Sequence, residues 1–102
     1  MRIATAERWL EEGRADLARQ DLTDLIPGMG ALDESKRSRT AIAWSRCLAA
    51  DGAVDGAVNF LRDTVRTLSD LKHRRLIYLA AAKLLEEAGD TKGALNAYRG
   101  IL

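Results

Sequence analysis

The chain has 102 residues, of which 47% are hydrophobic and 30% charged; this composition argues against intrinsic disorder and predicts a single domain over residues 1–102 with one modest core. Its 16 basic and 15 acidic residues leave a net charge of +1, which disfavours nucleic acid as the main partner because phosphate binding usually needs a basic excess. No apolar run approaches the roughly 20 residues that cross a bilayer, and the N-terminal residues lack the core of a signal peptide, so we expect no membrane insertion and no secretion.

Six helices are predicted, because Ala, Leu, Arg, Glu and Lys dominate and apolar residues recur at steps of three and four. Pro27, the only proline, lies beside Gly28 and Gly30 and predicts a loop. Asp33 and Asp70 each precede a longer helix, where a carboxylate can accept hydrogen bonds from the first unpaired amides. The predicted helices cover residues 3–13, 15–26, 34–51, 54–68, 71–88 and 91–102.

One unit is repeated three times along the chain, at approximately residues 1–30, 31–68 and 69–102. The second and third copies align at an offset of 37, which places Leu61 on Tyr98 and Gly52 on Gly89, and a weaker first copy aligns at an offset of 39, which places Leu22 on Leu61. Every copy predicts an amphipathic helix, a turn with glycine and a second helix with a small alanine for close packing. The predicted fold class is all-α, an array of about three antiparallel helix hairpins.

The turn and second helix of the third copy, Leu84 to Tyr98, resemble the tetratricopeptide repeat. The family's A-x-x-x-[FY] pattern is approximated twice, by Ala57, Val58, Phe60 and Leu61 and by Ala94, Leu95, Ala97 and Tyr98. The chain departs from the family in its repeat spacing, which exceeds the usual value of about 34, and in Ser69, which stands where proline is common. Pentatricopeptide repeats are the alternative, because residues 52–57 read Gly-Ala-Val-Asp-Gly-Ala. The resemblance implies a right-handed α-solenoid over nearly the whole chain.

The resemblance also implies a concave face lined by the first helix of each copy. The peptide-binding residues predicted on this face are Arg39, Ile42, Arg46, Leu79, Lys83 and Glu86. A wider set on the same face adds Ile3, Glu7, Leu10, Glu11 and Glu87. The cations suit an acidic segment or a C-terminal carboxylate, and Ile42 and Leu79 would form an apolar floor. The carboxylate clamp of chaperone-binding repeats is not matched, because Arg46 and Lys83 occupy the relevant positions.

Basic residues open the first helix of the second and third copies. The predicted basic edge consists of Lys36, Arg37, Lys72, Arg74 and Arg75. Positive charge at a helix N-terminus opposes the macrodipole, so helix stability alone does not account for these clusters. Two interpretations stay open: an anionic partner, or a solvated edge partly neutralised by Asp33, Glu34 and Asp70.

No catalytic or metal-binding motif is found in the sequence. Cys47 is the only cysteine and His73 the only histidine, and neither Cys-x-x-Cys nor His-Glu-x-x-His occurs. Cys47 lies in an apolar helix segment, which predicts a packed thiol rather than a reactive one. We therefore expect no enzyme activity, no cofactor and no metal. A single thiol permits no internal disulfide, which favours a cytoplasmic location.

The C-terminal helix remains apolar to its end, where Tyr98, Ile101 and Leu102 predict a self-associating surface or contacts within a longer array. The leading functional hypothesis is a non-catalytic scaffold or adaptor that binds a peptide or protein segment on the concave face. The alternatives are a nucleic-acid-binding helical repeat that uses the basic edge, and a self-assembly domain that forms homo-oligomers. Steep salt dependence would distinguish nucleic-acid binding from groove binding.

Overall fold

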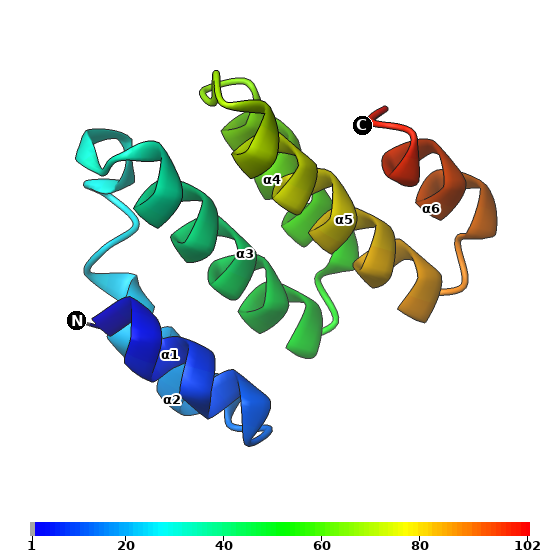
Figure 1. Cartoon of the computed structure of the whole chain (residues 1–102). Coiled ribbons are helices and arrows are strands. Elements are labelled where there is room, and N and C mark those ends of the chain that lie inside the picture. Colours follow the sequence, from blue (N-terminus) through cyan, green and yellow to red (C-terminus); the bar gives the residue numbers. More distant parts are fainter. Residues whose placement is uncertain (1) are drawn as a thin grey trace.

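The computed structural model of the chain describes residues 2–102, which form six α-helices, one short 3₁₀ helix and no strand. The helices are α1 (Arg2–Glu11), α2 (Ala15–Thr23), the 3₁₀ helix η1 (Met29–Ala31), α3 (Glu34–Ala50), α4 (Val54–Val65), α5 (Leu71–Glu87) and α6 (Thr91–Tyr98) (Figure 1). The predicted all-α class and the order of the helices are confirmed. Within residues 2–102, no helix has the length and apolar character of a membrane span.

Short local signals start and stop these helices. The side chains of Asp33, Asp70 and Asp90 accept hydrogen bonds of 2.8 Å from backbone amides in the first turns of α3, α5 and α6. This confirms the predicted caps at Asp33 and Asp70. The turns inside the three hairpins contain glycine with a φ of 75° to 85°, a conformation that other residues adopt only at a cost; these are Gly13, Gly52 and Gly89.

Every helix ends before the residue that the sequence pattern predicts, and the second, fourth and sixth helices do so by three residues or more. The second helix stops at Thr23 instead of residue 26, and the proline at position 27 disfavours helical geometry in the residue before it. The fourth helix stops at Val65 instead of residue 68. The last helix stops at Tyr98 instead of residue 102, because Gly100 adopts a φ of 79° and turns the chain away from the helix axis.

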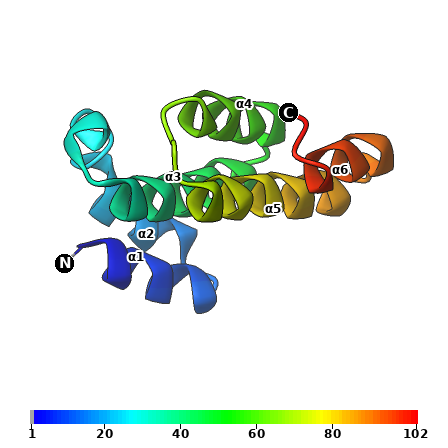
Figure 2. The ribbon, with the colours of Figure 1, turned by 45° about the horizontal axis from the view of Figure 1, so that its top comes forward.

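The helices pack as three successive hairpins, α1–α2, α3–α4 and α5–α6. The first helix of each later hairpin also packs on both helices of the hairpin before it: α3 contacts α1 and α2, and α5 contacts α3 and α4. The chain therefore advances from α1 at one end to α6 at the other (Figure 2). This packing is consistent with an array of helical hairpins.

Two apolar clusters hold the hairpins together, and α3 contributes to both. The smaller cluster joins α1, α2 and α3 through Ala6, Leu10, Ala18, Leu22, Ala43 and Cys47. The larger cluster joins α3 to α6 through Ala41, Ala57, Leu61, Val65, Leu68, Ile77, Ala81, Ala82, Leu84 and Ala97. Cys47 is fully buried, as predicted, and desolvation raises the pKa of its thiol. The numerous alanines allow close approach of the helices.

Glu34, in the first turn of α3, ties that helix to the start of α5. Its carboxylate accepts hydrogen bonds from the backbone amides of Ser69 and Asp70, at 2.7 and 2.9 Å, and from the Ser69 hydroxyl at 2.6 Å. These hydrogen bonds, of which the one from the Asp70 amide has the largest effect, lower the pKa of Glu34 from 4.5 to about 2. The ionised form therefore supports the contact between the second and third hairpins.

We expect this contact to weaken in acid. Because the pKa of Glu34 is lower in the folded chain than in the unfolded chain, its stabilisation is complete above pH 4.5 and is lost as the pH falls toward about 2. Glu34→Gln should lower stability near neutral pH and flatten the pH dependence in the acid range. Urea unfolding at pH values from about 6 to about 2.5 measures both effects, with the exposed Glu11→Gln as control. Parallel pH curves for Glu34→Gln and wild type would contradict the assignment.

Candidate functional site

A groove of about 540 Å³ lies between α3 and α5, the first helices of the second and third hairpins. The two helices contact each other directly. The groove is lined by Ile42, Ser45, Arg46, Leu76, Leu79, Ala80, Lys83, Leu84 and Glu87. On both helices these residues recur at steps of three and four, so they occupy one side of each helix.

The groove combines an apolar floor with charges at its rim. Leu76 and Leu79 are 42% and 40% exposed, although leucine side chains of a folded domain are usually buried. Arg46 on α3 and Lys83 on α5 are exposed, and within residues 2–102 neither forms an ion pair. The groove therefore offers apolar contact and two cations to a ligand.

Four residues predicted from the sequence for the concave face meet in this groove, namely Ile42, Arg46, Leu79 and Lys83. Glu87, from the wider predicted set, lies one turn beyond Lys83. Leu76 was not among the predicted residues. At the offset of 37, however, Leu76 is equivalent to Arg39, just as Leu79 is equivalent to Ile42 and Lys83 to Arg46. The repeat alignment of the predicted residue Arg39 therefore contains the signal for Leu76.

Two predicted groove residues lie elsewhere. Arg39 binds Glu7 of α1, with nitrogen–oxygen distances of 2.6 and 3.3 Å, and so bridges the first and second hairpins. The pKa of Arg39 is raised by the hydrogen bond and the charge of Glu7. Glu86 lies on the α6 side of α5, where its hydrogen bonding raises the pKa of Tyr98. Neither residue lines the groove.

The two junctions between first helices differ in one decisive way. The α1–α3 junction is closed by the ion pair of Glu7 with Arg39. Arg46 is equivalent to Glu7 at the offset of 39, and Leu76 is equivalent to Arg39, so the α3–α5 junction has an arginine and a leucine at these positions. Although Glu87 also lines the α3–α5 groove, Arg46 forms no ion pair with any carboxylate among the described residues.

Part of the predicted basic edge serves the fold. Arg37 donates to the carbonyl oxygens of Thr67 at 2.9 Å and Leu32 at 2.8 Å. Arg74, its equivalent in the next copy, donates to the carbonyl oxygens of Val65 at 3.0 Å and Leu68 at 2.9 Å. These oxygens lie at helix ends and in loops, where helical partners are missing. Both arginines therefore stabilise connections between helices.

The rest of the basic edge is more exposed. Lys36 is 3.9 Å from Asp33, a weak surface contact. Lys72 and Arg75 are exposed and form no ion pair within residues 2–102. Since two of its five cations donate to backbone carbonyl oxygens, the edge has fewer side chains free to contact a nucleic-acid backbone than the sequence suggests.

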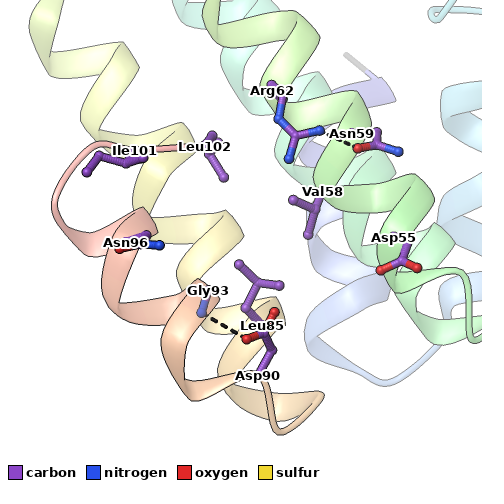
Figure 3. Close-up of a pocket in the computed structure, with 10 residues that line it drawn as sticks. All are labelled: Asp55, Val58, Asn59, Arg62, Leu85, Asp90, Gly93, Asn96, Ile101 and Leu102. Atoms are coloured by element: carbon purple, nitrogen blue, oxygen red, sulfur yellow. Dashed lines mark hydrogen bonds between the residues drawn. The ribbon is translucent and has the colours of Figure 1, made fainter.

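A second hollow, of about 410 Å³, lies between α4 and α6 (Figure 3). The two helices do not contact each other among the described residues, because each packs on first helices. Asp90 caps α6 here, and Arg62 donates a hydrogen bond to Asn59. Of the residues predicted for self-association, Leu102 is half-buried against the larger core, whereas Tyr98 and Ile101 are 48% and 56% exposed.

Within residues 2–102, no cluster of three or more His, Cys, Asp or Glu side chains could hold a metal ion. Comparison of the chain with protein-family models, with curated proteins and with solved structures gives no match. The function of the chain is therefore inferred from its own geometry.

Proposed function

We propose that the chain is a non-catalytic binding module, a right-handed tetratricopeptide-like array that holds a peptide or protein segment in the α3–α5 groove. The observation that supports this most is that Arg46 lies unpaired beside exposed leucines in the α3–α5 groove. At the preceding junction, between α1 and α3, the equivalent positions are Glu7 and Arg39, which form an ion pair. A carboxylate supplied by the ligand would give Arg46 the partner that the fold does not provide.

The groove favours a particular kind of segment. An acidic side chain or a C-terminal carboxylate would lie between Arg46 and Lys83, and an apolar side chain would cover Leu76 and Leu79. Glu87 adds a negative charge one turn beyond Lys83, which disfavours a second acidic group at that end. The expected ligand is therefore a short segment with an apolar residue close to one acidic group.

Selection from a displayed library of random peptides tests this proposal, because every combination of apolar and charged residues competes for the groove. Wild type should enrich peptides that combine an apolar with an acidic residue. Arg46→Glu/Lys83→Glu should bind the enriched peptides at least about tenfold more weakly, since two attractive contacts become repulsive, and should itself enrich basic peptides. Arg8→Glu/Arg66→Glu makes the same change of net charge at exposed sites outside the groove and serves as the matched control.

Two results would refute the groove proposal. One is enrichment by wild type of peptides without any preference for acidic residues. The other is equal loss of binding in the groove variant and in the control, which would show that net charge matters and the site does not. Nuclease treatment before selection ensures that a nucleic acid does not bridge the peptide and the chain.

A further inference from the structure

The large exposed apolar side chains are concentrated at one end of the molecule. Among residues 2–102 they are Leu71, Leu76, Leu79, Leu95, Tyr98 and Ile101, all of which lie on or after α5. Leu76 belongs to the groove and Ile101 to the hollow between α4 and α6. We define the α5–α6 face by the depression of about 440 Å³ between the two helices, which Leu71, Arg75, Leu79 and Tyr98 line, together with the exposed Leu95 one turn before Tyr98 on α6.

The repeat shows what kind of contact this face lacks. The second helix of a hairpin has two neighbours in the first two copies: α2 contacts α1 and α3, and α4 contacts α3 and α5. Among the described residues, α6 contacts α5 only. Accordingly Leu22 and Leu61 are fully buried, whereas the equivalent Tyr98 is 48% exposed. Val58 is 6% exposed and its equivalent Leu95 is 49% exposed.

The opposite end of the array does not offer a matching apolar surface. The outward side chains of α1 are small or charged, and among them Ala4, Thr5 and Arg8 are exposed. Arg8 would also meet Arg75 and Arg99 at the α5–α6 face, which is unfavourable. Head-to-tail stacking of copies is therefore disfavoured, and the surface best suited to cover this face is the same face of another copy.

Charge supports such a pairing. Arg75 and Glu86 are 11 residues apart on α5, about three turns, so they lie on the same side of that helix. In an antiparallel pair of α5 helices, Arg75 of one copy would approach Glu86 of the other, and twofold symmetry would make the contact twice. Glu86 also lies beside Tyr98, within the apolar face.

We propose that two copies of the chain pair through their α5–α6 faces about a twofold axis, with Leu71, Leu95 and Tyr98 in the apolar centre and Arg75 opposite Glu86 of the second copy. The groove residues Leu76, Lys83 and Glu87 lie on another side of α5, and only Leu79 borders both surfaces. The pair would thus leave two grooves open and bind two segments at once.

Sedimentation equilibrium over about a hundredfold range of concentration tests the pairing. Wild type should move from monomer to dimer. Arg75→Glu and Glu86→Arg should each raise the dimer Kd about tenfold or more, because two symmetric contacts become repulsive. An equimolar mixture of the two variants should form a heterodimer, and Arg75→Glu/Glu86→Arg in one chain should pair again. Leu95→Glu/Tyr98→Glu should remain monomeric, and Arg66→Glu at the end of α4 should behave as wild type.

The mixture is the decisive arm, because a direct contact between residue 75 of one copy and residue 86 of the other joins two chains that each fail to pair with themselves. Circular dichroism of every variant confirms that the exposed substitutions leave the helices intact. If the wild type stays monomeric over the whole concentration range, the proposal is overturned, and a helix of another protein becomes the expected partner of the α5–α6 face. A dimer that tolerates Leu95→Glu/Tyr98→Glu, or a mixture without heterodimer, overturns it equally. None of these outcomes depends on peptide binding in the groove.

Discussion

Leu61→Ala is expected to lower the free energy of unfolding by about 3 kcal/mol. Leu61 is fully buried on α4 and belongs to the larger apolar cluster, between α3 and α5. Truncation removes the buried methyl groups and leaves a cavity that the surrounding helices fill only in part. Urea unfolding followed by circular dichroism measures the loss.

The repeat supplies the matched control. Tyr98→Ala changes the equivalent residue of the third copy, which is 48% exposed, so it should cost less than about 1 kcal/mol in the monomer. Both variants are compared at a protein concentration where the chain is monomeric, so that pairing does not contribute. Equal costs at the two positions would contradict the difference in burial. A negligible cost for Leu61→Ala would contradict the packing of α4 against α5.

The features predicted most accurately from the sequence are those with a local cause. Asp33 and Asp70 cap helices because a carboxylate before a helix can reach the free amides of the first turn. Gly52 and Gly89 end helices because they adopt a positive φ without strain. Both signals act within a few residues, so a linear reading detects them.

Burial at equivalent positions could not be predicted in this way. Leu61 and Tyr98 align in the repeat, and the alignment treats them alike, yet one is fully buried and the other half-exposed. The difference arises because α5 covers α4, whereas no helix within the described residues covers α6 in the same manner. Exposure depends on neighbours in space, which the repeat pattern does not contain.

Only part of the candidate groove could be predicted from the sequence, because contacts between residues far apart in the chain decide the rest. Ile42, Arg46, Leu79 and Lys83 share one face of the first helices, so their spacing alone brings them together. Arg39 satisfies the same spacing but binds Glu7 across the neighbouring junction. Whether a cation is free to bind a ligand or is paired within the fold depends on residues that are distant in the sequence, as Glu7 is from Arg39.

Arg74→Met is expected to lower the free energy of unfolding by about 2 kcal/mol. Methionine keeps much of the aliphatic stem but removes the guanidinium that binds the carbonyl oxygens of Val65 and Leu68. These oxygens lie at and beyond the end of α4, where helical amide partners run out; the Val65 oxygen also accepts one backbone hydrogen bond, from the Leu68 amide at 3.2 Å. A third contact, to the Tyr78 hydroxyl at 3.3 Å, is also lost. Urea unfolding provides the measurement.

Arg75→Met is the control at the next position, because Arg75 is exposed and forms no ion pair among residues 2–102. It should change monomer stability by less than about 0.5 kcal/mol. If Arg74→Met lowers the free energy of unfolding as little as Arg75→Met does, the carbonyl contacts do not stabilise the fold. The basic cluster would then again be interpreted as a site for an anionic partner. If only Arg74→Met is destabilising, the basic start of α5 has two separate roles. Arg74 then holds the end of the preceding hairpin, and Arg75 remains available at the α5–α6 face for pairing with a second copy.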